Sequence, residues 1–405
     1  MEVRGQKEGL LNGVRVLDLA DEKASFCSKL LADMGASVIK IERPGGDPSR
    51  KIGPFGGHSP HPEKSLFFQY HNTNKLGITL NLEHPEGKEI FLNLLKANDI
   101  VIETFLPGHL ENLGLGFEVL NQINPKIILV SVTGFGQDGP RSEFKSCDLV
   151  ASAFGGQMYV SGSPSSPPLK AFGEQSYYTA SLFAAIAILL AIRKRAISGK
   201  GDHIDISLQE AVASTLEHVI IRYSYEQILP KRQGSLHWDR SFCILPCKDG
   251  HLLVAPFQQW ETLVEWMDSE GMAEDLRDEK YREEAYRLRH VDHIIEVLER
   301  WTRTHTTDEL FELGQIMRFP WAPVLSPKEV LNSPQMGARE FFIEVDHPEM
   351  ESRLKYPGVP YRLSGGSLDQ WRRAPLIGEH NVQVYQGELG LSEKEIESLS
   401  SIGAI

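Results

Sequence analysis

The sequence of 405 residues has few cysteines, no excess of positive charge and no apolar run at its start. Four cysteines are too few for a disulfide framework, and this number is typical of a protein from a reducing cytoplasm, which is the location that we expect. The chain has 42 lysine and arginine residues against 55 acidic residues, and the resulting formal net charge of −13 argues against bulk nucleic-acid binding. Because the N-terminal residues are polar, we expect no signal peptide.

Long hydrophobic segments are also missing. The longest apolar stretch, residues 177–192, is shorter than the ~20 residues that a helix needs to cross a bilayer. Its many small residues suit close packing, so we predict a buried helix over 177–195 and no membrane association. At 41% hydrophobic residues the chain can bury a large core, which excludes intrinsic disorder as its main state.

Short apolar runs alternate with helical patterns in the first half of the chain. Such alternation is typical of a parallel sheet with helices on both faces, so we predict an α/β fold with a doubly wound, Rossmann-like layout. The predicted strands are 14–20, 37–42, 99–105, 127–132 and 203–208. Around 225–245, aromatic, basic and proline residues mix without a period, and we predict a linker at 221–245.

Two short motifs lack the context that a ligand site needs. Residues 134–139 spell G-x-G-x-x-G, but Pro140 and a polar run follow where a dinucleotide site needs a helix, so we predict a loop. Cys243 and Cys247 are spaced C-x3-C without two further ligands nearby, which favours buried or partly buried thiols. We therefore expect no metal site.

Eight segments in order along the chain resemble the class III CoA-transferases, the family of formyl-CoA and carnitine CoA-transferases. Each segment is weak alone, but the ordered set spans nearly the whole chain. The segments are LNGVRVLDLA (11–20), LLADMGASVIKIERPGGDPSR (30–50), NTNKLGITLNLEHPEG (72–87), VIETFLPG (101–108), LGLGFEVLNQINPKIILVSVTGFGQDGP (113–140), SGKGDHIDISLQEA (198–211), PGVPYRLSG (357–365) and APLIGEH (374–380).

The resemblance implies a domain organisation. The N-terminal part of the Rossmann-like large domain would cover 1–220, the linker 221–245 and a smaller α+β domain 246–330. Residues 331–405 would return to the large domain. Two such chains would interlock as a dimer, each enclosing part of the other.

The family's chemistry depends on an aspartate, which attacks the donor thioester and later carries CoA as an enzyme thioester. In the family's pattern that aspartate lies ten residues after the first proline of a Pro-Pro pair. Here the pair is Pro167-Pro168, and the tenth residue is Tyr177. A phenol has no carbonyl carbon to carry CoA as a thioester, and at a pKa of ~10 it is mostly protonated at neutral pH. Tyr177 therefore cannot perform this reaction.

Other positions also depart from the family. Glu83 stands where the formyl-CoA branch has a lysine in the CoA site, and Asn112 stands where an arginine lies near the phosphates. Cys147 replaces the histidine that the racemase branch has before Asp148. Arg43 and Leu80 do match, so the resemblance implies these two as CoA-binding positions. The loop after the first strand is also altered: the family's Gln-Ala-Gly-Pro appears as Lys-Ala-Ser-Phe at 23–26.

Three functions remain open from the sequence. In the first, the chain is a non-catalytic subunit that pairs with a homologous catalytic chain, as in two-subunit members such as benzylsuccinate CoA-transferase. Alternatively, it is an active CoA-transferase, alone or as a homodimer, with a relocated nucleophile at Glu174 or Asp148. The third possibility is a non-enzymatic ligand-binding protein on the same scaffold. A CoA thioester would be a substrate and not a covalent cofactor, and under the first hypothesis the partner alone could bind it.

Overall fold

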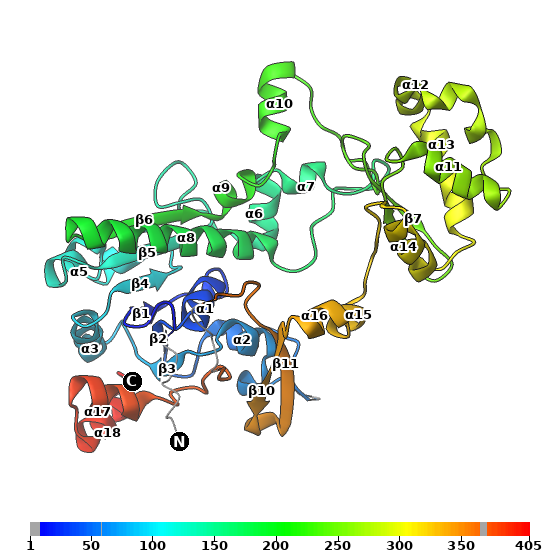
Figure 1. The fold of residues 1–405 in the computed structure, drawn as a ribbon. Helices are drawn as coiled ribbons and strands as arrows, with labels where there is room; N and C mark the ends of the chain where they lie inside the picture. Colours follow the sequence, from blue (N-terminus) through cyan, green and yellow to red (C-terminus); the bar gives the residue numbers. More distant parts are fainter. Residues whose placement is uncertain (1–8, 58, 365–370) are drawn as a thin grey trace. The chain divides into compact units, whose positions relative to one another are not determined.

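The computed structural model describes residues 9–57, 59–364 and 371–405. Within these residues the chain forms two compact units (Figure 1). The larger unit comprises the chain up to residue 157, 170–224 and 338–405, and the smaller unit comprises 158–169 and 225–337. Residues 1–8, where no signal peptide is expected, and Gly365, which ends the tail segment 357–365, lie outside the described residues.

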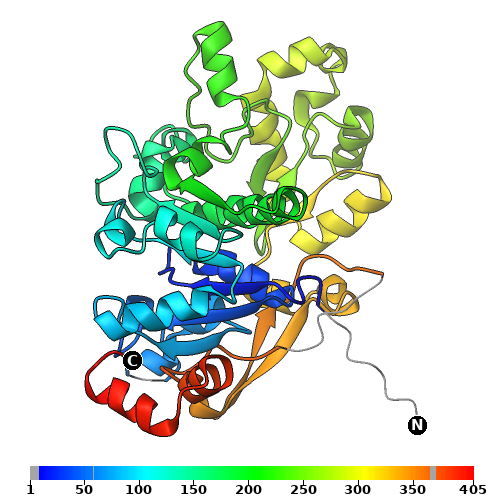
Figure 2. The same ribbon diagram turned by 90° about the vertical axis from the view of Figure 1, so that its left-hand side faces the viewer.

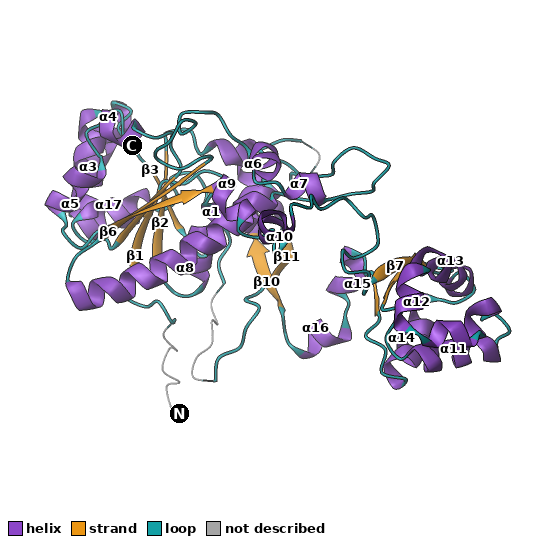
Figure 3. Cartoon of the chain, turned by 90° about the horizontal axis from the view of Figure 1, so that it is seen from above, coloured by secondary structure: helices purple, strands orange, loops and turns teal. Residues whose placement is uncertain are grey.

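A six-stranded parallel sheet forms the centre of the larger unit (Figure 3). Its order, β3-β2-β1-β4-β5-β6, is the Rossmann order, which confirms the predicted doubly wound α/β fold. The order reverses between β1 and β4, and such a switch point opens a crevice at the carboxyl ends of the strands. The strands are β1 (Arg15–Asp18), β2 (Ser37–Glu42), β3 (Leu76–Thr79), β4 (Ile100–Glu103), β5 (Ile128–Thr133) and β6 (Asp202–Ser207).

Helices cover both faces of this sheet and divide its core in two. One apolar cluster joins the sheet to α1 (Ser25–Asp33), α6 (Asp148–Phe154), α8 (Gln175–Ser198) and α9 (Leu208–Ala213). The other joins it to α3 (Pro85–Leu95), α4 (His109–Asn112), α5 (Phe117–Ile123) and α17 (Asn381–Leu389). The remaining helices of this unit include α2 (Leu66–His71) and α18 (Glu393–Ser401). Two more helices lie at its boundaries: α7 (Gln157–Val160) begins at its last residue before the smaller unit, and α10 (Val219–Glu226) ends two residues beyond it.

Helix α8 corrects one prediction. The sequence predicts a buried helix, but only one face of α8 is buried, and small residues such as Ala180 and Ala184 make up much of it. Small side chains allow the close approach of α8 to α1 and the sheet. Ile188 is buried among them, whereas five other bulky side chains point away from the core of the unit. Leu182, Phe183, Ile186, Leu189 and Leu190 form this exposed face, and Leu190 is 63% exposed.

The C-terminal segment belongs to the larger unit from residue 338 onward. It forms the antiparallel pair β10 (Phe342–His347) and β11 (Ser352–Pro357) and then the two terminal helices. The Tyr385 hydroxyl donates a 2.5 Å hydrogen bond to the Thr79 carbonyl oxygen, which ties α17 to the end of β3. Figure 2 shows α17 and α18, in red, beside the blue and cyan N-terminal elements.

The smaller unit packs helices against a three-stranded antiparallel sheet around the buried Trp301 and Trp321. Its strands are β7 (Cys243–Pro246), β8 (His251–Val254) and β9 (Ala322–Pro323). Its helices are α11 (Trp260–Ser269), α12 (Glu284–Arg289), α13 (Val291–Thr302), α14 (Thr307–Ile316) and α15 (Pro327–Leu331), and α16 (Pro334–Ala338) leads out of it. The range 221–245, predicted as a linker, contains the end of α10 and the start of β7.

Candidate functional site

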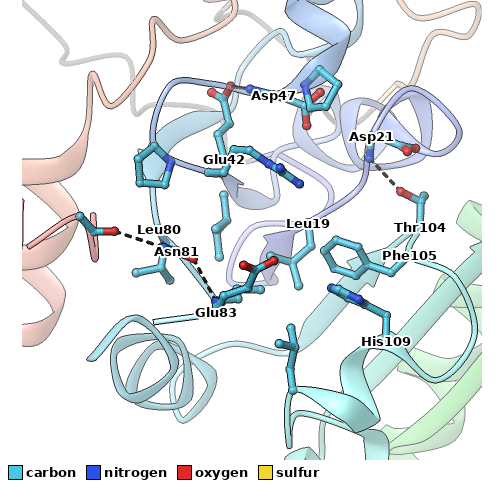
Figure 4. A pocket seen from close by; sticks show the side chains of 17 residues that line it. Leu19, Asp21, Glu42, Asp47, Leu80, Asn81, Glu83, Thr104, Phe105 and His109 are labelled. Atoms are coloured by element: carbon cyan, nitrogen blue, oxygen red, sulfur yellow. Dashed lines mark hydrogen bonds between the residues drawn. The ribbon is translucent and has the colours of Figure 1, made fainter. Parts of the chain in front are cut away.

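A cavity of about 410 Å³ lies at the carboxyl ends of β1, β2, β3 and β4 in the larger unit (Figure 4). This is the position where doubly wound sheets bind ligands, and the volume is in the range of small-molecule pockets. Its apolar lining consists of Leu19, Ile41, Leu80, Leu82, Phe105 and Leu113. Ile41 is the penultimate residue of β2, Leu113 directly follows α4, and the others follow buried strands, so the end of the sheet fixes most of the floor of the cavity.

The structure brings several of the sequence-predicted positions to this cavity. Arg43, Leu80 and Glu83 all line it, although they come from the ends of two different strands. Asn112 is not among its lining residues, but His109 and Leu113 on either side of it are. From the loop after β1, Asp21 lines the cavity, whereas the altered positions 23–26 do not.

Two further carboxylates on the cavity are held in buried ion pairs. Glu42 accepts hydrogen bonds from the Arg50 guanidinium at 2.6 and 2.7 Å, and Arg50 also packs over the Phe68 ring. Asp47 lies 3.1 Å from the Lys40 ammonium group. Burial opposes ionisation of Asp47, but the charge of Lys40 and the hydrogen bonds from Ser49 and Lys40 together outweigh it and hold the pKa of this carboxyl below its usual value. Both carboxylates are therefore already neutralised by the protein.

Tyr177, which the sequence predicts to stand at the family's aspartate position, is almost completely buried in the same unit. Its side chain belongs to the core cluster between the sheet and α8, with 5% exposure. Its hydroxyl oxygen accepts a 3.0 Å hydrogen bond from the Asp148 backbone N–H in the first turn of α6. Burial, followed by the nearby charge of Glu22, raises the pKa of Tyr177. The phenol is a neutral structural group in this environment.

Asp148, one of the two fallback nucleophiles, is occupied by hydrogen bonds. Its Oδ1 accepts from the Ser176 backbone N–H at 2.9 Å and from the Ser176 hydroxyl at 2.7 Å, and it thereby satisfies the first turn of α8. Its Oδ2 lies 2.7 Å from the Lys170 ammonium group. These contacts give Asp148 a helix-capping role and place its second oxygen in an ion pair.

Glu174, the other fallback, directly precedes α8 and is partly buried. Its side chain does not cap the helix. Burial, followed by the charges of Asp148 and Glu22, raises the pKa of Glu174. A carboxyl group near other acids stays protonated up to a higher pH, and it is therefore less available as an anion.

An aromatic cluster surrounds the start of α8, and sequence reasoning missed it. The Phe26 and Tyr178 rings meet edge to face with centroids 4.7 Å apart, and the Tyr178 hydroxyl lies 3.1 Å from His71 Nε2. Burial lowers the pKa of His71 to about 4, so its imidazole is neutral. Only the folded sheet brings together these residues from three separate segments.

A second unpredicted network begins at the end of β4, next to Thr104 and Phe105 of the cavity lining. Buried Glu103, at the end of β4, accepts a 2.6 Å hydrogen bond from the Phe105 backbone N–H and another from the Ser131 hydroxyl. Ser131 Oγ also lies 2.9 Å from His203 Nε2 on β6. Phe105 and His109, whose ring centroids are 4.6 Å apart, form the adjoining wall of the cavity. For Glu103 and Phe105 the sequence offered one signal, their position at and just after the end of a strand.

Other classes of site find no support in the described part of the chain. No group of three histidine, cysteine or acidic side chains is arranged there to hold a metal ion. Burial raises the pKa of Cys243 to about 12 and of Cys247 to about 11, which disfavours thiolate chemistry. None of the described helices is long and apolar enough to cross a membrane.

Comparisons with known proteins agree with this geometry. The family model described as CoA-transferase family III matches residues 11–381. The chain is 32% identical over 400 residues to succinyl-CoA:(R)-benzylsuccinate CoA-transferase subunit BbsE of Thauera aromatica, covering 96% of this chain and 97% of that protein. It is 31% identical over 397 residues to the succinyl-CoA–L-malate CoA-transferase beta subunit of Chloroflexus aurantiacus, with coverage of 96% and 97%. A solved CAIB/BAIF family protein from Brucella suis has a TM-score of 0.85 and 30% identity, covering 95% of this chain and 100% of that chain.

Proposed function

The chain belongs to CoA-transferase family III, and we propose that it acts as the non-catalytic subunit of a two-chain enzyme that transfers CoA between carboxylic acids. The observation that carries this proposal is the buried Tyr177 at the position where the family's chemistry needs an aspartate. A phenol oxygen can at most accept an acyl group as an ester, and it cannot then form a thioester with CoA. The second half of the transfer therefore needs a carboxylate from another chain.

The partner that we propose is a homologous chain that carries the aspartate. Two of the relatives named above are subunits. The exposed apolar face of α8, formed by Leu182, Phe183, Ile186, Leu189 and Leu190, needs a cover that the larger unit does not supply. A second chain of the same fold, interlocked with this one as the sequence predicts, would bury this face. We predict a cytoplasmic location, because the low number of cysteines is typical of proteins from a reducing compartment.

We place the CoA thioester on the partner chain. In this chain Arg43 and Leu80 remain at the cavity, but Glu83 lies there too, where an anionic ligand would meet a negative charge. Several relatives are named for succinyl-CoA and a second dicarboxylic acid. We therefore expect succinyl-CoA as the donor, with an aromatic or aliphatic dicarboxylic acid as the acceptor.

The test is a reconstitution with the homologous chain encoded beside this one. Transfer from succinyl-CoA to a panel of dicarboxylic acids is measured for this chain alone, the partner alone and the mixture. We expect no transfer by this chain alone and full transfer by the mixture. In the mixture, replacing the partner's aspartate with asparagine should abolish transfer, whereas Tyr177→Phe in this chain should preserve it. Full transfer by the isolated chain would refute the proposal.

One observation favours a second candidate function. Glu174 is a partly buried carboxyl near Asp148, and no hydrogen bond to its side chain is found within the described residues. It could act as a relocated nucleophile in an enzyme that needs no partner. Glu174→Gln distinguishes the two functions, because it would abolish transfer in that case and would leave the activity of the two-chain enzyme unchanged.

A further inference from the structure

The cavity at the strand ends has an uneven charge distribution. Four carboxylates line it, from Asp21, Glu42, Asp47 and Glu83, against the single guanidinium of Arg43 and the imidazole of His109. Glu42 and Asp47 are neutralised as described above, and Asp21 is paired with Lys23. Within the described residues, Glu83 and Arg43 are the charged groups on the cavity for which no ion pair is found. The ligand therefore meets one free carboxylate and one free guanidinium.

The backbone fixes the position of Glu83. Its N–H donates a 3.0 Å hydrogen bond to Asn81 Oδ1, and the Asn81 N–H donates a 2.8 Å bond to the Ala404 carbonyl oxygen. Gly87 on α3 packs so closely on this turn that a Cβ there would lie 2.0 Å from the Asn81 carbonyl oxygen. The turn after β3 is thus clamped between α3 and the C-terminus. Figure 4 shows the Glu83 carboxylate pointing into the cavity.

The location and the floor of the cavity suit a nucleotide. It opens at the carboxyl ends of the strands beside the β1–β4 switch point, where Rossmann folds bind nucleotides. Its apolar floor and the aromatic wall of Phe105 and His109 can receive a base. In such folds an acidic side chain at the end of the second strand accepts hydrogen bonds from ribose hydroxyls, and it disfavours a phosphate on the ribose by charge repulsion. Here the acid at the end of β2, Glu42, is engaged by Arg50, and Glu83, after the neighbouring β3, is the carboxylate at this edge of the sheet for which the described residues show no ion pair.

We propose that this cavity binds a nucleotide with free ribose hydroxyls in preference to one with a ribose phosphate, and that Glu83 determines this preference. Glu83 accepts hydrogen bonds from the ribose diol, and Arg43 receives the 5′-phosphate groups, for which a guanidinium is well suited. Coenzyme A carries a 3′-phosphate on its ribose and is therefore disfavoured here. The inference rests on the proposed function, in which the partner chain and not this one holds the CoA thioester.

The test compares coenzyme A with 3′-dephospho-coenzyme A, which differ only in the ribose 3′-phosphate. Isothermal titration calorimetry on the full chain should show that the dephospho form binds at least tenfold more tightly. Glu83→Gln should reduce this ratio to about threefold or less, and Glu83→Lys should reverse it. Glu89→Gln, an exposed acid on α3 outside the cavity lining, is the matched control and should leave the ratio unchanged. Circular dichroism melts establish that each variant is folded.

Three results would overturn the inference: no binding of either nucleotide, equal or tighter binding of coenzyme A by the unaltered chain, or a preference that Glu83→Gln leaves intact. The proposed function fails by a different readout, namely CoA transfer by the isolated chain. A chain that transfers CoA alone could still show the tenfold ratio, and a silent chain could lack it. The two failures are therefore distinguishable.

Discussion

Glu103 offers the prediction with the best-defined magnitude. Burial raises its pKa to about 7, and the nearby charges of Glu111 and Asp21 act in the same direction, whereas hydrogen bonds from Ser131 and Phe105 oppose the rise. In the unfolded chain a glutamate titrates near 4.5. Because the folded state holds its proton more tightly, this group makes the protein less stable as the pH rises from about 4.5 to about 7. The total loss is about 3 kcal/mol of unfolding free energy.

Glu103→Gln tests this reasoning, because the amide is neutral at every pH and its oxygen can still accept from the Phe105 N–H. The free energy of unfolding is measured by urea denaturation at several values between pH 4.5 and 8.5. We expect the variant to gain stability over the unaltered chain as the pH rises, to about 3 kcal/mol above pH 8. The difference between the two proteins isolates Glu103 from other titrations, including that of His203, whose pKa burial lowers.

The control is Glu118→Gln, an exposed acid on α5. Its stability difference from the unaltered chain should stay nearly constant over the same range. If Glu103→Gln shows the same constant difference, or a loss of stability that grows with pH, the buried carboxyl does not titrate as the structure requires. The assignment of Glu103 as a carboxyl whose pKa is raised by burial would then be refuted.

Three further substitutions test the packing that we describe. Tyr177→Phe leaves the buried Asp148 N–H without an acceptor and should lower the unfolding free energy by about 2 kcal/mol in urea denaturation, and no change would contradict a structural role for the phenol. Asp148→Ala should lower the unfolding free energy by about 3 kcal/mol, because the Ser176 N–H and hydroxyl lose their acceptor. Asp148→Asn should lower it clearly less, since its amide oxygen can still accept these hydrogen bonds. Equal losses for the two variants would argue against the capping role. The third substitution is Ile186→Asp, at a side chain on α8 that is 54% exposed. It should change the unfolding free energy of the isolated chain by no more than about 0.5 kcal/mol but abolish association with the partner in analytical ultracentrifugation. Unaltered association would show that α8 is not part of the interface.

The sequence predicted most of the sheet for a simple physical reason. Strands covered on both faces are short continuous apolar runs, and β2 (Ser37–Glu42) agrees with its predicted range. The prediction missed β3, because Leu76–Thr79 has only four residues and contains a glycine. It also treated α8 as buried, because an all-round apolar pattern does not reveal which face lies against the chain's own core.

The candidate site was less predictable than the fold. Arg43, Leu80 and Glu83 could be singled out by resemblance, and the structure brings them to one cavity. Glu103, Ser131 and His203 could not, because they lie on three strands and only the register of the parallel sheet brings them together. For such networks the physical link is tertiary, and no spacing along the chain encodes it.

The central claim is that this polypeptide carries no nucleophile able to hold an acyl group or CoA. The most direct measurement is intact-protein mass spectrometry of the two-chain complex after incubation with succinyl-CoA, with hydroxylamine used to trap activated carboxyl groups. The account predicts a CoA or hydroxamate adduct on the partner chain and no mass change on this one. An adduct on this chain that maps to Glu174 or Asp148 would contradict it.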